Sequence, residues 1–157
     1  MVQAATHRTD TAPVVRWGKR GPELVQMWWG FRSASGTEPI INVRAESANI
    51  AKRRCLVPPT ELDLFTGAGH PKQRWKVTVK GESVFFFAAL WRQATAQWPQ
   101  SYAVVTIAAA ADLSPLTDRQ PAIILPSGAG TWLSGQTDPS ELLKPLPSGS
   151  FDVQLMP

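Results

Sequence analysis

Cysteine, histidine and tyrosine are scarce in this chain, whose 157 residues include one cysteine, two histidines and one tyrosine. A single cysteine, Cys55, excludes an intrachain disulfide. Together with His7 and His70, which are far apart in the sequence, it cannot complete a structural zinc site. We therefore expect no metal and no cofactor. A chain without disulfides fits a reducing compartment, so we expect a cytoplasmic protein.

Long apolar runs and the common catalytic loops are also missing. No stretch approaches the roughly 18 apolar residues of a membrane span, and the N-terminus lacks the basic region and apolar run of a secretory signal. Gly67-Ala68-Gly69 lacks the lysine and the helix that follow a phosphate-binding loop. Ser127 lacks the preceding glycine of a nucleophile elbow. Cys55 lies in an apolar strand pattern, which favours a buried, unreactive thiol.

Proline, glycine and tryptophan are plentiful by contrast. Fourteen prolines and eleven glycines predict many turns and short elements, and they argue against a helical bundle. Seven tryptophans indicate either a thick core or an aromatic binding surface. The net charge of +4 suits a polyanionic partner without identifying one. The sequence leaves the oligomeric state open.

The local patterns predict a chain dominated by short strands. We expect one domain over residues 1–157, with residues 1–11 as a loose lead-in. Hairpins are predicted where two apolar runs flank a turn. Strands that pair as hairpins, rather than through crossover helices, indicate an α+β fold with a mainly antiparallel, curled, barrel-like sheet. The predicted strands are 12–16, 23–29, 53–57, 75–79, 83–91, 102–109, 121–125 and 151–155, with hairpins formed by 12–16 with 23–29 and by 75–79 with 83–91, and the predicted short helices are 46–52, 128–134 and 139–143.

The stretch 39–47 carries the most informative polar pattern. Asn42, Arg44 and Glu46 occupy alternate positions after an apolar start, so in a strand they would share one face. An amide, a guanidinium and a carboxylate on one face form a polar constellation. The plainer interpretation is a solvated edge strand with an Arg–Glu pair, and the local pattern alone favours it.

Two further segments leave alternatives open. In the turn 116–121, Asp118 and Arg119 could pair with each other, or Arg119 could converge on Arg44 to form an anion site. Trp28 and Trp29 end a predicted strand, so their rings point to opposite faces. Either both are in the core, or one lies at a rim near Arg44 and stacks on a base.

Five segments then resemble, in order, the motifs of one known family over residues 12 to about 150. Residues 26–31 are similar to its Met-Arg-Trp-Gly-Leu segment, and 41–47 to its Ile-Asn-Ala-Arg-Ala-Glu-Thr segment, the most specific of the five. Residues 53–58 resemble the strand that follows. Residues 87–91 resemble Phe-Ala-Gly-Leu-Trp, and 117–125 resemble His-Asp-Arg-Met-Pro-Val-Ile-Leu. The family is the SOS-response-associated peptidase (SRAP) family.

The resemblance implies a barrel-like α+β fold that binds single-stranded DNA in a basic cleft during the response to DNA damage. In the family, the cysteine exposed by removal of the initiator methionine captures the aldehyde of an abasic site as a thiazolidine. An asparagine, a glutamate and a histidine assist. The same groups are proposed to release a propeptide, which makes the family peptidase-like, a class of hydrolase.

This sequence departs from the family at the reactive positions. Val2 follows Met1 where the family has cysteine, and the segment before the first matched strand has no counterpart, which suggests a degenerate or N-terminally truncated member. Leu64 stands for the glutamate and Thr117 for the histidine. Among the catalytic groups only Asn42 is retained. The DNA-side candidates are Arg44, Arg119, Trp28 and Trp29.

Three hypotheses follow, and they leave enzymatic activity uncertain. The favoured one is a single-stranded DNA-binding homologue, with possible preference for abasic sites, that lacks the crosslinking and autopeptidase chemistry. The second is an active family enzyme whose start was assigned too late, and the third is a non-functional remnant. The replacements at Leu64 and Thr117 count against the second, because a wrong start cannot explain positions inside the chain.

Overall fold

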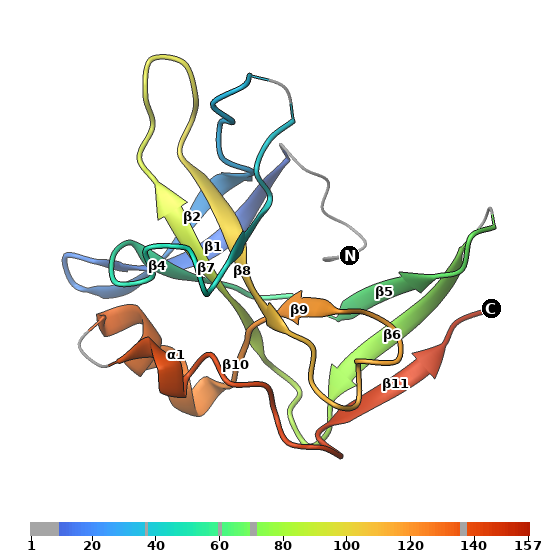
Figure 1. Ribbon diagram of the computed structural model, residues 1–157. Helices are drawn as coiled ribbons and strands as arrows, with labels where there is room; N and C mark the ends of the chain where they lie inside the picture. The colour runs from blue at the N-terminus through green and yellow to red at the C-terminus, as the bar shows by residue number, and fades with distance from the viewer. Residues whose placement is uncertain (1–9, 37, 60, 70–71, 136–137) are drawn as a thin grey trace.

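A mixed β-sheet closed into a barrel forms the larger part of the fold (Figure 1). The structure is a computed structural model, and it describes residues 10–36, 38–59, 61–69, 72–135 and 138–157. Strands β7 and β8 pair with each other in addition to their places along the sheet, and this pairing closes the ring. The eight strands are β1 (Thr11–Gly18), β2 (Gly21–Trp29), β3 (Asn42–Arg44), β4 (Arg54–Val57), β7 (Phe86–Arg92), β8 (Ser101–Ala108), β9 (Arg119–Pro121) and β10 (Ile123–Ile124).

Strand β8 is the centre of this sheet. It is buried from Ser101 to Ile107, and it contacts β2 and β3 on one edge and β7 and β9 on the other. A strand buried on both faces is mainly apolar, and in β8 the polar exceptions are Ser101 and Thr106. β2 and β3 run parallel to β8, whereas the other pairs are antiparallel. The predicted mainly antiparallel, barrel-like sheet is confirmed, with these two parallel pairs as an addition.

Alternate residues of the barrel strands build two cores. Val14, Cys55 and Val104 belong to the inner core, whereas Leu56, Ala103 and Val105 belong to an outer core. This division follows from the period of two along a strand. Cys55 is fully buried, and burial raises the pKa of its thiol well above the ordinary value. The predicted buried cysteine is therefore confirmed.

One helix, α1 (Pro126–Ser134), covers the outer core. Proline at its first turn suits a helix start, and Gly135 after its end has φ 68°, the left-handed conformation that glycine tolerates. Trp132 is fully buried, and its Nε1 donates to the carbonyl of Cys55 at 2.8 Å. The Arg54 guanidinium lies over the Trp132 ring, 4.8 Å from the centroid. The helix is thus held to β4 by one tryptophan.

A second sheet of three strands lies beside one end of the barrel (Figure 1). Its order is β11 (Phe151–Leu155), β6 (Gln73–Val79) and β5 (Leu62–Thr66). Leu62, Val77 and Phe151 from this sheet join the same inner core as the barrel residues. A short 3₁₀ turn, η1 (Pro139–Glu141), precedes β11, and the Asp138 carboxylate caps it by accepting a hydrogen bond from the Ser140 amide.

Several sequence-based expectations need correction. Residues 46–52 form turns rather than a helix. Residues 75–79 do not pair with 83–91, because β6 pairs with β5 and β11 instead, and β5 was not predicted. Of the lead-in 1–11, residues 1–9 lie outside the described residues. The Asp10 carbonyl accepts a hydrogen bond from the Trp29 amide, and Thr11 begins β1, so the sheet starts within the predicted lead-in.

Candidate nucleic-acid interface

The C-terminal half of β8 brings three of the predicted site residues together. Asn42 pairs with Val104 and Arg44 with Thr106 across the β3–β8 edge, and Arg119 pairs with Ala108 across the β8–β9 edge. Residues directly opposite one another in a ladder project from the same face. Because Val104 belongs to the inner core, this face is the inner one, at one end of the barrel. We call Asn42, Arg44, Glu46, Thr106 and Arg119 the barrel mouth.

Arg119 and Glu46 form the best-defined contact of the barrel mouth. Two parallel hydrogen bonds join Arg119 Nη1 and Nη2 to the Glu46 carboxylate at 2.7 and 2.8 Å. Arg119 Nη2 also donates to the Thr106 carbonyl at 2.9 Å. The bond to Arg119 lowers the pKa of Glu46 to about 2, and Glu46 in turn raises the pKa of Arg119. The ion pair of Arg119 is therefore with Glu46, 73 residues away, and not with Asp118.

Arg44 supplies a second cation beside the same carboxylate. Its side chain is exposed, and its charge also helps to lower the pKa of Glu46. No ion pair of Arg44 occurs within the described part of the chain. One guanidinium, that of Arg119, is thus bound to the carboxylate, whereas Arg44 acts on it through its charge alone. This leaves Arg44 available for an anion such as a phosphate.

Asn42 contributes a polar group without a partner. Its Oδ1 atom is buried and accepts no hydrogen bond from the residues that the structure describes. Buried polar atoms normally have a partner, so an unpartnered amide next to the two arginines is a feature that needs an explanation. The residue itself is half-buried on the inner face, opposite Val104.

Leu64 and Thr117 lie close to each other, although the sequence separates them widely. Both line a hollow of about 310 Å³, together with Phe65, Lys72 and Leu116. Leu64 is 2% exposed, and the Thr117 hydroxyl donates to the Arg119 carbonyl at 2.8 Å. Neither side chain can act as a general acid or base near neutral pH.

The two tryptophans point to opposite faces, but neither is at the barrel mouth. Trp29 is 6% exposed, and its Nε1 donates to the Ile41 carbonyl at 3.1 Å. Trp28 packs edge-on against Trp98, with 5.7 Å between the ring centroids. Trp28 pairs with Ser101 and Arg44 with Thr106, positions about 16 Å apart along β8. The structure therefore does not bring Trp28 beside Arg44.

Sequence reasoning missed a buried carboxylate next to Leu64. Asp63 on β5 is fully buried, and Arg74 Nε lies 3.2 Å from its Oδ1. Arg74 also contacts Glu61 at 3.3 Å. Burial and the neighbouring Asp63 carboxylate raise the pKa of Glu61. The alternation of acidic and apolar residues from 61 to 64 is the signal that would have revealed this strand.

The described ranges hold neither a metal-binding cluster nor a helix that could span a membrane. No group of three or more His, Cys, Asp or Glu side chains there could hold a metal ion. None of the helices in that part of the chain is both long and apolar enough to cross a membrane.

Comparisons with known proteins add a family and a fold. The family model described as SOS response associated peptidase (SRAP) matches residues 3–156. No curated protein matches the chain. Among crystal structures, a Bordetella bronchiseptica protein is similar over 100% of this chain and 89% of its own, with 20% identity and a TM-score of 0.80. A Bacteroides thetaiotaomicron protein is similar over 95% of this chain and 75% of its own, with 22% identity and a TM-score of 0.78. A phage-related Bordetella bronchiseptica protein is similar over 95% of this chain and 79% of its own, with 20% identity and a TM-score of 0.74. At these identities the likeness concerns the fold alone.

Proposed function

This chain belongs to the SOS response associated peptidase (SRAP) family, and on that basis we propose that its barrel mouth binds single-stranded DNA. The observation that carries the proposal is that Arg44 and Arg119 lie opposite Thr106 and Ala108, on one face at the same end of β8, with Arg44 exposed and outside any described ion pair. A planar guanidinium suits a phosphate oxygen pair. The unpartnered Oδ1 of the half-buried Asn42 adds an acceptor for a sugar or a base.

We further propose that this member lacks the cysteine-dependent crosslinking chemistry. Thiazolidine formation needs an amine and a thiol on adjacent carbons, and Cys55 cannot supply this pair because it is internal and fully buried. Leu64 and Thr117 stand where the family resemblance expects a glutamate and a histidine, and neither can transfer a proton in the reaction. Binding without covalent capture is the function that these residues support.

The binding proposal is tested by titration of labelled oligothymidylate at several salt concentrations, followed by fluorescence anisotropy. Each phosphate contact contributes a slope of about −0.7 to log K against log salt for a single strand. We expect Arg44→Ala to flatten the slope by about that amount and to weaken binding to all sequences alike. Lys144→Ala, which removes an exposed cation on another part of the surface, is the matched control.

Two results would contradict the binding proposal. One is undetectable binding of the wild-type chain at low salt, and the other is an unchanged slope in Arg44→Ala. The chemical part is tested separately with an oligonucleotide that contains one abasic site. We expect no band that survives denaturation without an added reductant. A stable adduct would show that a nucleophile other than Cys55 is at work.

A further inference from the structure

We propose that the opposite end of the barrel, at the β1–β2 hairpin, carries a second contact surface for single-stranded nucleic acid. We call it the hairpin groove. It consists of a hollow of about 860 Å³ around the hairpin and an adjoining one of about 470 Å³, which share Trp91. The residues that matter are Arg16, Trp17, Lys19, Arg20, Arg53 and Trp91. The proposal does not rest on the function of the barrel mouth.

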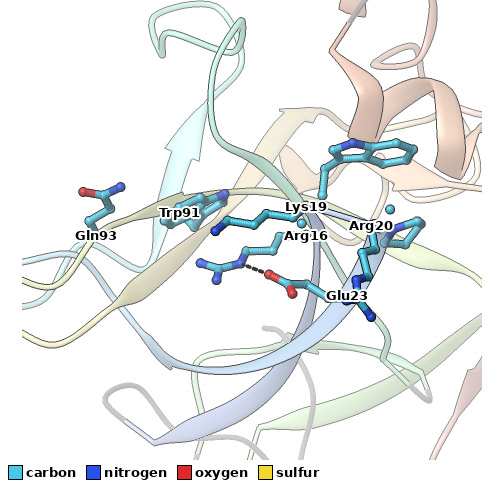
Figure 2. A pocket seen from close by; sticks show the side chains of 10 residues that line it. Arg16, Lys19, Arg20, Glu23, Trp91 and Gln93 are labelled. Atoms are coloured by element: carbon cyan, nitrogen blue, oxygen red, sulfur yellow. Dashed lines mark hydrogen bonds and ion pairs between the residues drawn. The ribbon is translucent and has the colours of Figure 1, made fainter.

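The geometry of the first hollow is set by a short turn and one indole ring. The hairpin pairs Arg16 with Glu23 and Gly18 with Gly21, so Lys19 and Arg20 occupy its tip. Arg16 Nε donates to Glu23 at 2.8 Å, and its guanidinium lies over Trp91, 4.8 Å from the ring centroid. Figure 2 shows the Lys19 side chain extending past Arg16 toward Trp91, with Arg20 beside Glu23. The Arg16 guanidinium therefore covers one partly buried aromatic ring, and Lys19 of the tip extends toward the same ring.

A second arginine extends this arrangement into the adjoining hollow. The Arg53 guanidinium lies 5.9 Å from the centroid of the same Trp91 ring, and Arg92 lies 4.1 Å from that of Phe31. A guanidinium stacked on an aromatic ring is held in one plane while its N–H edges stay free for hydrogen bonds. These stacked arginines are thus preorganised to receive anionic oxygens.

The distribution of charge separates this surface from the rest of the molecule. Six cationic side chains and one carboxylate line the two hollows, and this excess is larger than the net charge of +4 of the whole chain. The carboxylate, Glu23, is already paired with Arg16. Within the described residues, Lys19, Arg20 and Arg53 take part in no ion pair. The barrel mouth, by contrast, has Arg119 neutralised by Glu46.

An exposed tryptophan indicates which polyanion fits. Trp17 lies in β1 next to the hairpin tip and is 51% exposed, unusually open for so large an apolar side chain. A base stacks on such a ring, whereas an acidic peptide has no comparable flat group. Cations for phosphates and an aromatic face for a base are the two elements that single-strand binding surfaces combine. We therefore assign single-stranded nucleic acid rather than an acidic peptide.

The hairpin groove is distinct from the barrel mouth. On the paired strands β7 and β8, Trp91 lies opposite Tyr102 and Arg92 opposite Ser101, near the start of β8. The mouth residue Arg44 lies opposite Thr106, near the end of β8. β2 runs parallel to β8, and its last residues, Trp28 and Trp29, pair with the first residues of β8. The hairpin tip, at the start of β2, therefore lies beyond the start of β8, on the side opposite to the barrel mouth. Substitutions at one end should leave the other end intact.

The test compares two double variants that each remove two exposed cations. Lys19→Ala with Arg20→Ala alters the hairpin tip, and Lys80→Ala with Lys144→Ala alters surface positions outside both sites. Each is titrated with labelled 20-nucleotide oligothymidylate at 50 and 200 mM salt. If the two tip cations each contact a phosphate, the wild type should lose about sevenfold more affinity over this range than the tip variant does. The control pair should behave as the wild type.

Trp17 provides the second arm of the test. Loss of one stacked base should weaken binding by about five- to 150-fold in Trp17→Ala, and Trp17→Phe should restore most of it, since Phe keeps a π-face. Because Trp17 is exposed, neither change is expected to unfold the chain. Circular dichroism of both variants checks this.

Three outcomes would overturn the proposal. In the first, the tip variant and the control pair have the same salt slope. In the second, Arg44→Ala reduces the affinity while the tip and Trp17 variants leave it unchanged, which would make the barrel mouth the binding surface. In the third, polyglutamate of matched charge displaces the oligonucleotide as well as unlabelled oligothymidylate does, which would exclude a preference for nucleic acid.

Discussion

Among individual residues, Glu46 decides how much positive charge the barrel mouth offers. Its carboxylate holds Arg119 through two short hydrogen bonds, and Arg44 lies close enough to lower its pKa further. A phosphate must therefore compete with Glu46 for Arg119, whereas Arg44 is already available. Glu46 acts as an internal substitute for an anionic ligand, and its removal should strengthen the site.

Glu46→Gln is expected to increase the affinity for single-stranded DNA, because the amide no longer neutralises Arg119. One additional phosphate contact should steepen the salt slope by about 0.7. The matched control is Glu141→Gln, which removes the partner of the exposed Lys144. Anisotropy titrations of the two variants provide the measurement. A weaker affinity in Glu46→Gln would mean that the carboxylate itself holds the site in shape.

The same residue predicts a dependence of stability on pH. Folding lowers the pKa of Glu46 from 4.5 to about 2, so its ion pair stabilises the fold fully above about pH 5. This contribution is lost as the pH falls from 4.5 toward 2, when the carboxylate becomes protonated. The difference in melting temperature between the wild type and Glu46→Gln should therefore be constant above pH 5 and shrink below it. A difference that persists unchanged at pH 2 would contradict the assignment.

Among the elements, helix α1 is positioned by two buried side chains, Leu133 and the larger Trp132. Trp132 is fully buried between the helix and β4, donates to the carbonyl of Cys55 and stacks under Arg54. The helix is nine residues long, and no basic side chain lies in its last turn and no acidic one in its first. So short a segment is marginal by itself in water. Packing against the outer core is thus what keeps it helical.

Trp132→Ala should destabilise the protein by about 3–5 kcal/mol, because it leaves a cavity in the outer core. Trp132→Phe should cost less, about 1–2 kcal/mol, since most of the ring volume remains while the hydrogen bond to the Cys55 carbonyl is lost. Urea unfolding gives both values. Trp17→Phe, at an exposed position, is the control and should change stability by less than about 0.5 kcal/mol. Equal losses for the two Trp132 variants would show that the hydrogen bond dominates.

At the scale of the whole molecule, the two sheets share one inner core. Leu62 of β5 and Val77 of β6 lie in the same buried cluster as Val104 of β8. The barrel mouth is bounded by this junction, since Leu64 lies across from Thr117. We therefore expect the barrel and the three-stranded sheet to unfold together as one cooperative unit.

Leu62→Ala tests this coupling, because Leu62 is 1% exposed and belongs to the smaller sheet. A loss of about 2–5 kcal/mol is expected from the cavity. Hydrogen exchange should show that protection falls equally at amides of β6 and of β8. If protection falls in β6 alone, the small sheet opens independently, and the mouth then has one mobile wall.

Some of this protein was determined by neighbouring residues in the sequence. The hairpin of β1 and β2, the buried strand β8, the helix that begins near Gly128 and the Asp138 cap all follow from short-range patterns, and the structure has each of them. The ordered family motifs likewise indicated a barrel-like sheet, which is confirmed. The period of two also placed Asn42 and Arg44 on one face.

The choice of partners was decided only by the tertiary structure. β6 could not be assigned to β5 and β11 in advance, because hydrophobic pattern restricts which face of a strand is buried but not which strand lies beside it. The same holds for Arg119, whose partner Glu46 is 73 residues away rather than adjacent. Trp28 lies far from Arg44 because β2 pairs with the start of β8, at Ser101, whereas Arg44 of β3 pairs with Thr106 near its end. Closure of the barrel sets the stagger between neighbouring strands, and closure depends on all of its strands together.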